Sequence, residues 1–150
     1  MSTRGLLSAL LLGVSIGLGA LREFLFVNLN YQLDHLSRGS AWSYAHSAFQ
    51  RAVSGWDLSA LIRLKWLLAL LFIGLTLGLT LVLARVRFGD HRLTRPVLLA
   101  FVLLGGLALL LHFGAARIPF LHLISVQLLH ALQYPVPLLL VLAVSWGRRG

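Results

Sequence analysis

One stretch near the end of the sequence combines polar residue types that could do chemistry inside an otherwise apolar segment. Gln127, His130 and Tyr134 follow one another at helical spacing and therefore share a helix face. Gln133 stands beside them, and His122 precedes His130 by about two turns. Such a face could hold a polar head group, relay a proton or ligate a metal ion. The alternative, which we favour, is that these side chains hydrogen bond to neighbouring helices.

Two histidines on separate apolar runs, His112 and His130, have the side-chain type of axial haem ligands. Their expected depths differ, because His112 stands near the end of its run whereas His130 stands well inside the next one. We therefore predict no cofactor and no metal ligands. A haem or quinone redox subunit is kept as an alternative function.

Glu23 stands near the end of the first apolar run, where it could couple proton movement to transport in a small oligomeric transporter. The face that carries His130 is the other candidate site for such a transporter, which is kept as an alternative function. The neighbouring Arg22 is not expected to pair with Glu23, since adjacent helical side chains point about 100° apart. The favoured reading is that Glu23 reaches toward water at the edge of the run.

Catalytic motifs are missing from the sequence. It contains no Cys, which removes disulfides, thiolate catalysis and Cys-ligated metals from consideration. It also contains no GxSxG, HExxH or phosphate-binding glycine loop, and its four acidic residues offer little material for metal-dependent chemistry. We predict that the protein is not an enzyme and has no catalytic residues.

The elements that position these side chains are indicated by composition. Of the 150 residues, 59% are hydrophobic and 11% are charged, whereas roughly a quarter are charged in an ordinary soluble domain. Hydrocarbon offers no water to the backbone, so the continuous Leu-rich runs predict transmembrane helices and not the alternating strands of a barrel. We predict an all-α integral membrane bundle of about four transmembrane helices, forming a single domain over residues 1–150.

Four spans are predicted, at about residues 5–27, 58–84, 96–113 and 119–146. Pro135 and Pro137 interrupt the fourth span, where they should free the carbonyls of Ala131 and Gln133 and kink the helix. The part after Pro137 is too short to cross a core of roughly 30 Å alone, so both halves belong to one crossing.

Cap residues mark the starts of two spans. Ser54 and Asp57 have the spacing of a capping box and introduce the second span. Thr94 and Pro96 form a cap and first-turn pair that starts the third span.

Small residues spaced by four predict close helix packing in two of the spans. A GxxxG motif in the first span is extended in register by Gly5 and Ala9. A second GxxxG motif is accompanied by Thr76 and Thr80, which can donate hydrogen bonds back to their own helix or across to a neighbour. The partner helix could belong to this chain or to another. The helix-packing residues predicted in this way are Gly13, Gly17, Gly74 and Gly78.

An amphipathic interfacial segment is predicted at about residues 28–57, between the first two spans. The first helix can emerge from the bilayer and continue to about Ser37, after which Arg38, Gly39 and Ser40 predict a break. Aromatic residues typical of the headgroup level follow, and they indicate a short helix on the membrane surface. These residues are Trp42, Tyr44, Phe49 and Trp56.

The distribution of Arg predicts the orientation. The connection after the second span carries four Arg and the one after the third carries one, so the Arg-rich connection should face the cytoplasm. Both termini are then cytoplasmic in a bacterial inner membrane. The charged start followed by an apolar run is also typical of a signal peptide, and cleavage after Gly19 or Ala20 is the alternative to a retained helix.

The net charge of +9 would in a soluble protein suggest nucleic acid as a partner. Here the basic residues stand mainly at the ends of apolar runs, where they meet anionic lipid, and no nucleic acid partner is expected. The expected partners are the lipid bilayer and a membrane protein or further copies of this chain.

The first half of the chain resembles certain small multi-spanning bacterial membrane proteins, some of them associated with exosortase-type protein-sorting systems. The resemblance rests on Leu21-Arg22-Glu23-Phe24-Leu25-Phe26-Val27-Asn28-Leu29-Asn30, then Tyr44, Trp56 and Leu64-Lys65-Trp66. It implies an accessory role near a membrane protease-transpeptidase and transfers no functional residues. We therefore expect a non-catalytic accessory or assembly subunit of a larger membrane system.

Overall fold

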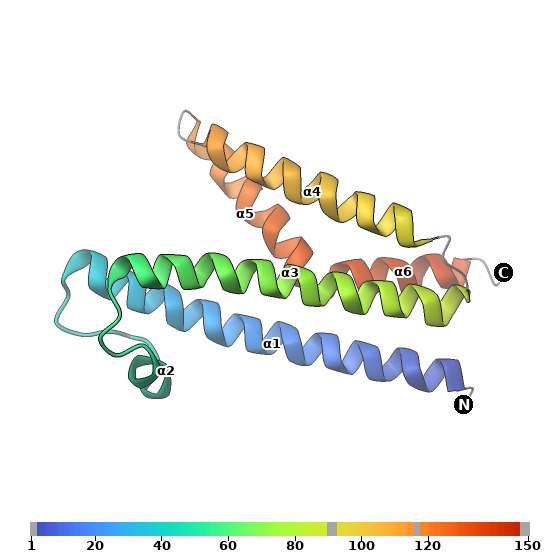
Figure 1. The fold of residues 1–150 in the computed structure, drawn as a ribbon, viewed down its shortest axis with the longest axis horizontal. Coiled ribbons are helices and arrows are strands. Elements are labelled where there is room, and N and C mark those ends of the chain that lie inside the picture. The colour runs from blue at the N-terminus through green and yellow to red at the C-terminus, as the bar shows by residue number, and fades with distance from the viewer. Residues whose placement is uncertain (1–2, 90–92, 116–117, 148–150) are drawn as a thin grey trace. The chain divides into compact units, whose positions relative to one another are not determined.

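The computed structural model describes residues 3–89, 93–115 and 118–147 of the chain. The middle of the Arg-rich connection and the outermost residues of both termini lie outside this described part. In the described residues the chain forms helices and no β-strand, which confirms the all-α class. Figure 1 shows these helices in chain order: α1 (Thr3–Arg38), α2 (Ser47–Ala52), α3 (Leu58–Phe88), α4 (Thr94–Gly114), α5 (Pro119–Gln133) and α6 (Val136–Gly147).

Three of these helices, α1, α3 and α4, are each long and apolar enough to cross a membrane. The pair α5 and α6 meets the same criterion together, with a bend of 61° at the break between them. The order of apolar helices and the kink in the last one are therefore as predicted. The helix α1 continues to Arg38, close to the predicted end at about Ser37, whereas α3 continues to Phe88, beyond the end of the predicted span at residue 84.

The contacts divide the chain into two compact units. Unit 1 comprises Met1–Gly17 and Ile73–Gly150, and unit 2 comprises Leu18–Phe72. The helices α1 and α3 each contribute residues to both units.

Two helices end at glycines whose backbone conformation disfavours a side chain. Gly39 has a φ of 61° after α1, and the amide of Ser40 donates a 3.2 Å hydrogen bond to the carbonyl of His35. Gly89 has a φ of 67° after α3 and donates to the carbonyl of Arg85 at 2.9 Å. Because a Cβ is strained at such φ values, these glycines stop the two helices where they do. The break predicted at residues 38–40 is confirmed.

The start of α3 is capped by Asp57 alone. One carboxylate oxygen of Asp57 accepts the amide of Ala60 at 2.9 Å, and the other accepts the hydroxyl of Ser59 at 2.7 Å. The hydrogen bond from Ser59, that from Ala60 and the charge of Arg63 hold the pKa of Asp57 below its ordinary value of 3.8. The predicted helix start is right, but the capping box with Ser54 is wrong, since Asp57 occupies the cap position and not the third helical position.

The start of α4 also differs from the prediction by one position. Leu93 occupies the cap position without a side-chain hydrogen bond, and Thr94 is the first helical residue. Pro96 still lies in the first turn, where its missing N–H costs no intrahelical hydrogen bond.

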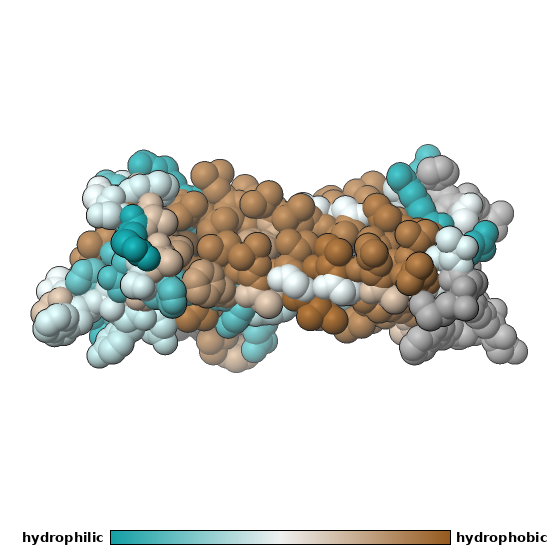
Figure 2. All heavy atoms as spheres, turned by 90° about the horizontal axis from the view of Figure 1, so that it is seen from below, coloured by the Kyte–Doolittle hydropathy of each residue, from teal (hydrophilic) through white to brown (hydrophobic). Residues whose placement is uncertain are grey.

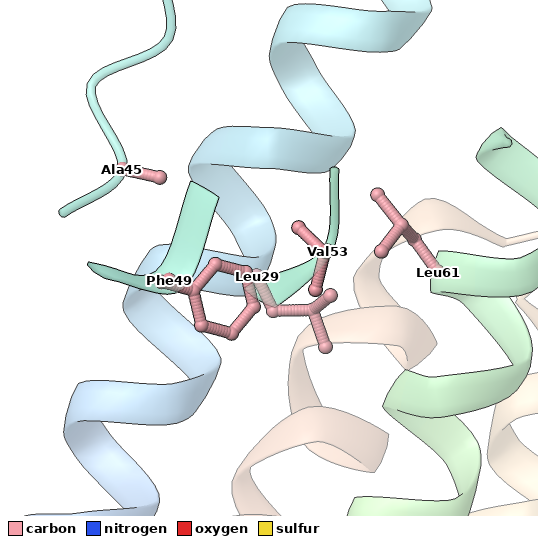
Figure 3. Close-up of a cluster of buried hydrophobic side chains, with 5 residues drawn as sticks. All are labelled: Leu29, Ala45, Phe49, Val53 and Leu61. Carbon is pink, nitrogen blue, oxygen red and sulfur yellow. The ribbon is translucent and has the colours of Figure 1, made fainter. Parts of the chain in front are cut away.

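Unit 2 has a core built from α1, α3 and the segment 45–53 between them. Leu29 of α1 and Leu61 of α3 are completely buried, and Ala45, Phe49 and Val53 close over them. Figure 3 shows Phe49 and Val53 pointing toward Leu29, with Leu61 reaching in from α3. The predicted short helix between the first two spans is present as α2, and Phe49 is its buried residue.

Unit 1 has a core formed by the end of α3 against α6. Leu83 and Leu138 are completely buried there, and Leu142 is 8% exposed. The partly buried Leu11 and Leu12 of α1 pack against the same cluster. These contacts hold the kinked C-terminal helices against α3.

Candidate functional site

The polar residues predicted to share one face of the last span differ in their exposure. This polar stripe consists of Gln127, His130, Gln133 and Tyr134. Gln127 and His130 are exposed on α5, whereas Gln133 is 4% exposed. Tyr134 follows α5 in an extended conformation, and its amide donates to the carbonyl of His130 at 3.0 Å. The rings of His130 and Tyr134 meet edge to face, with centroids 6.1 Å apart. The stripe thus offers one exposed polar patch beside the kink and one buried amide inside unit 1.

The kink is stabilised by a hydroxyl from another helix. Pro137 has no N–H for the carbonyl of Gln133, and the Thr76 hydroxyl of α3 donates to this carbonyl at 3.4 Å. Thr80 donates to the carbonyl of Thr76 at 2.7 Å. The sequence predicted both kinds of hydrogen bond for these threonines, and each occurs once. The kink at Pro135 and Pro137 therefore has a specific partner on α3.

Small residues pack closely between α4 and α5, at positions that were not predicted from the sequence. The Ser125 hydroxyl donates to the carbonyl of Ala108 at 2.8 Å, and both residues are completely buried. A Cβ on Gly114 would lie 3.2 Å from Leu121, so this turn of the hairpin is also tight. The available signal was the pair Gly105 and Ala108, which stand three residues apart on one helix face.

The ring contacts of the histidines differ from the pair of axial ligands that the haem hypothesis requires. His112 on α4 lies beside His122 on α5, with ring centroids 5.8 Å apart, and it also contacts Phe113. The hypothesis had paired His112 with His130, whose ring lies against Tyr134. Across the described ranges, no group of three or more His, Asp or Glu residues is placed to hold a metal ion.

Both GxxxG motifs lie on exposed helix surface. Gly13, Gly17, Gly74 and Gly78 are all exposed, and a Cβ added to any of them would meet nothing within 4 Å. The two glycines of each motif stand two residues before and two residues after a buried polar residue, which is Ser15 in α1 and Thr76 in α3. Since two residues turn a helix by about 200°, the glycines point away from the packed face. The described part of the chain therefore leaves both glycine faces uncovered.

Arg22 and Glu23 do contact each other, which corrects the sequence-based expectation. A guanidinium nitrogen of Arg22 lies 3.3 Å from a carboxylate oxygen of Glu23, and the guanidinium carbon lies 4.5 Å from the ring centroid of Phe26. The Arg22 side chain is 3% exposed and that of Glu23 is 56% exposed. The expectation considered only the directions of the Cα–Cβ bonds, whereas the long Arg side chain can bend round the helix to its neighbour.

A set of amide side chains ties the 39–57 segment to α1. Asn28 accepts the backbone amide of His46 and donates to the carbonyl of Phe24 at 2.7 Å. Gln32 accepts the hydroxyl of Ser43 at 2.8 Å. On the α3 side, the ammonium of Lys65 donates to Asn30 at 2.8 Å. The sequence showed these residues as a region of mixed polarity, but not which pairs would form.

Comparisons of the chain with protein-family models, with curated proteins and with solved structures found no match.

Proposed function

We propose that this protein is a non-catalytic accessory or assembly subunit of a larger system in a bacterial inner membrane. In this proposal α1, α3, α4 and the bent pair α5–α6 each cross the bilayer once, and both termini face the cytoplasm. Its role is to present helix faces to another membrane protein or to further copies of itself.

Membrane insertion is supported by the apolar surface that the helices leave exposed. In the most apolar window of each long helix, only 17% of α1, 28% of α3 and 11% of α4 is buried. Figure 2 shows apolar side chains in brown over most of the drawn helix surface. Leu103 and Leu110 of α4, for example, are 68% and 72% exposed. Soluble monomers rarely expose apolar patches of more than a few hundred Å², whereas lipid tails solvate them without penalty.

The observation that carries the assembly role is the pair of uncovered glycine faces. Lipid gives helices no hydrophobic reason to associate, so they associate where small residues allow their backbones to approach closely. The glycines of α1 and α3 provide such faces, and the described residues of this chain do not cover them. An atom added at any of the four glycines meets nothing within 4 Å, so the described residues leave these faces open to a second helix. The resemblance of the 21–66 region makes a protein-sorting system the first partner system to test.

The test replaces both glycines of a motif by Leu and measures copurification in mild detergent. Gly74→Leu with Gly78→Leu, and separately Gly13→Leu with Gly17→Leu, should lower the recovered partner or the oligomer at least tenfold. Gly106→Leu is the matched control, because Gly106 is an exposed helical glycine that also has nothing within 4 Å of an added Cβ. It should leave copurification unchanged. A chain that is alone and monomeric in several gentle extractions would contradict the proposal.

A further inference from the structure

An open apolar cleft lies in unit 1, between α3, α4 and α6. Its volume is about 230 Å³. Apolar cavities of about 150 Å³ already accommodate a benzene ring, so the cleft has room for a segment of hydrocarbon chain. Its lining includes Thr80, Pro96, Val97, Ala100, Phe101 and Val141.

The wall of the cleft is almost entirely apolar. Thr80 is the polar residue in the lining, and its hydroxyl donates to the carbonyl of Thr76 at 2.7 Å. It is 1% exposed, so the wall presents no competing polar surface to a ligand. An occupant of this cleft is therefore apolar where it lies against the protein.

The cleft follows from the kink. α4 packs along α5, where Ser125 bonds to Ala108, but α6 leaves the direction of α5 by 61°. Beyond the bend, α6 packs on α3 through Leu138 and Leu142 against Leu83. α4 and α6 therefore diverge, and Pro96 and Val97 of α4 line the cleft together with Pro137, Leu140 and Val144 of α6.

Basic residues stand at the end of the cleft where α3 stops and α4 begins. Arg87 donates from Nε to the Ser145 hydroxyl at 3.1 Å, next to Val144 in the cleft wall. Arg95 is exposed and adjoins Pro96 of the lining, and Arg85 is exposed one turn before Gly89. This end of the cleft is therefore positively charged.

We propose that the cleft binds one acyl chain of an anionic phospholipid, whose headgroup phosphate is held by Arg87 and Arg95. The inference rests on the membrane insertion and the orientation proposed above, and it is independent of any protein partner. The acyl chain matches the apolar wall, and the phosphate matches the basic end in the leaflet where anionic lipids are found. A free phosphate ion has no group to place against the apolar wall, and a second apolar helix has no charge to place against the arginines.

The experiment is native mass spectrometry of the full chain with phosphatidylglycerol or phosphatidylcholine of identical acyl chains. The wild type should retain phosphatidylglycerol more strongly. Replacing both Arg87 and Arg95 by Gln should weaken this retention roughly 5–30-fold, since each basic residue contributes about 1 kcal/mol with an anionic lipid. Arg95→Gln alone should have part of the effect. Because this variant keeps the Arg87–Ser145 hydrogen bond, it still tests the proposal if loss of that bond in the double variant impairs folding.

Two further variants separate the cleft from general surface charge. Arg51→Gln with Arg63→Gln removes the same charge from exposed positions in unit 2 and should leave retention unchanged. Ala100→Phe fills the cleft with a side chain and should weaken retention of both lipids at least fivefold.

The proposal is overturned if the unit 2 control weakens retention as much as the Arg87 and Arg95 pair does. The proposal is also overturned if the Ala100→Phe protein retains lipid like the wild type. This holds equally if the substitution releases a copurified protein, because the occupant of the cleft would then be that protein and not a lipid. Carbonate extraction of each variant from membranes reports insertion separately. Failure of lipid binding in an inserted protein is thereby distinguished from failure of the proposed function.

Discussion

The hydroxyl of Ser125 on α5 donates a 2.8 Å hydrogen bond to the backbone carbonyl of Ala108 on α4. The carbonyl of a helical residue normally accepts only from its own helix, so this contact requires the two backbones to lie very close. Ala108 provides the room, since its own side chain is a single methyl group and is completely buried. The α4–α5 hairpin is thus joined in part by a contact between small and polar residues.

We expect Ser125→Ala to destabilise the protein by about 0.6 kcal/mol and by no more than about 1.7 kcal/mol, the average and the maximum measured for interhelical hydrogen bonds in a membrane protein. Ser8→Ala is the matched control, because Ser8 is also buried but donates to Arg4 of its own helix at 2.8 Å. Its effect should be smaller. Unfolding in mixed micelles, followed by circular dichroism, measures both. Equal losses in the two variants would show that the contact to Ala108 adds nothing.

The contact between Thr76 and Gln133 predicts a coupled pair of substitutions. Thr76→Val should cost about 1–3 kcal/mol, because it leaves the carbonyl of Gln133 without the donor on α3. Pro137→Ala restores a backbone N–H four residues after Gln133, so the cost of Thr76→Val should be lower in that background.

Thr80→Val is the control for this cycle, since Thr80 donates within α3 to Thr76. Its cost should be the same whether residue 137 is Pro or Ala. Double-mutant cycles by equilibrium unfolding measure the coupling. Strict additivity of Thr76→Val and Pro137→Ala would rule out the proposed relationship.

The cap of α3 predicts a pH dependence. The folded pKa of Asp57 lies below its ordinary value of 3.8, so its contribution to stability is fully present above that value. The contribution is lost as the pH falls through the folded pKa, because the protonated carboxyl no longer accepts both hydrogen bonds. Asp57→Ala should lower stability at neutral pH and reduce the decline of stability in acid. Unfolding midpoints measured from pH 6 downward test this, and parallel curves for the two proteins would refute it.

Asn28 should control how firmly the segment before α2 is held on α1. In Asn28→Ala the amide of His46 loses its acceptor, and local opening should become about 5–30-fold more frequent. Trypsin cleavage after the exposed Arg51 should accelerate by a similar factor. Asn30→Ala provides the comparison, because Asn30 bonds to Lys65 and not to this segment. If both variants are cleaved at the wild-type rate, Asn28 does not hold the segment.

The proposed orientation can be measured with single cysteines, because the chain has none of its own. Ser54→Cys precedes α3 at an exposed position and should react with a membrane-impermeant maleimide from outside intact spheroplasts. Thr3→Cys begins α1 and should react only after permeabilisation. The opposite pattern would show the reverse orientation. If both cysteines reacted from outside, both positions would lie on the same side of the membrane, and α1 could not cross it once as proposed.

Several local features followed from residue type because they depend on few neighbours. Gly39 ends α1, and Pro135 and Pro137 stand at the bend between α5 and α6. Both features were predicted from the sequence, since the backbone properties of Gly and Pro are intrinsic. The cap of α3 was predicted at the right place but with the wrong partner. Helix starts depend on which of several polar residues reaches the free N–H groups, and Ser54 and Asp57 both qualified by type.

Contacts between distant residues were harder to predict. Gln133 and His130 stand three residues apart on α5, yet Gln133 is buried, with its carbonyl accepting from Thr76 of α3, whereas His130 is exposed. The small-residue contact formed at Ser125 and Ala108, whereas both GxxxG motifs stayed uncovered in the described residues. The spacing of small residues shows which faces permit close approach, but not which face a particular neighbour selects.

The sequence by itself determined that the protein consists of long apolar helices, where the kink and the breaks fall, and which faces carry small or polar residues. These properties depend on hydrophobicity and backbone preference, which act within a few residues. Only the tertiary structure decided that Thr76 meets Gln133, that His112 meets His122 and that a cleft opens between α4 and α6. Those outcomes depend on the direction in which each helix leaves its turn, and a bend of 61° redirects every side chain beyond it.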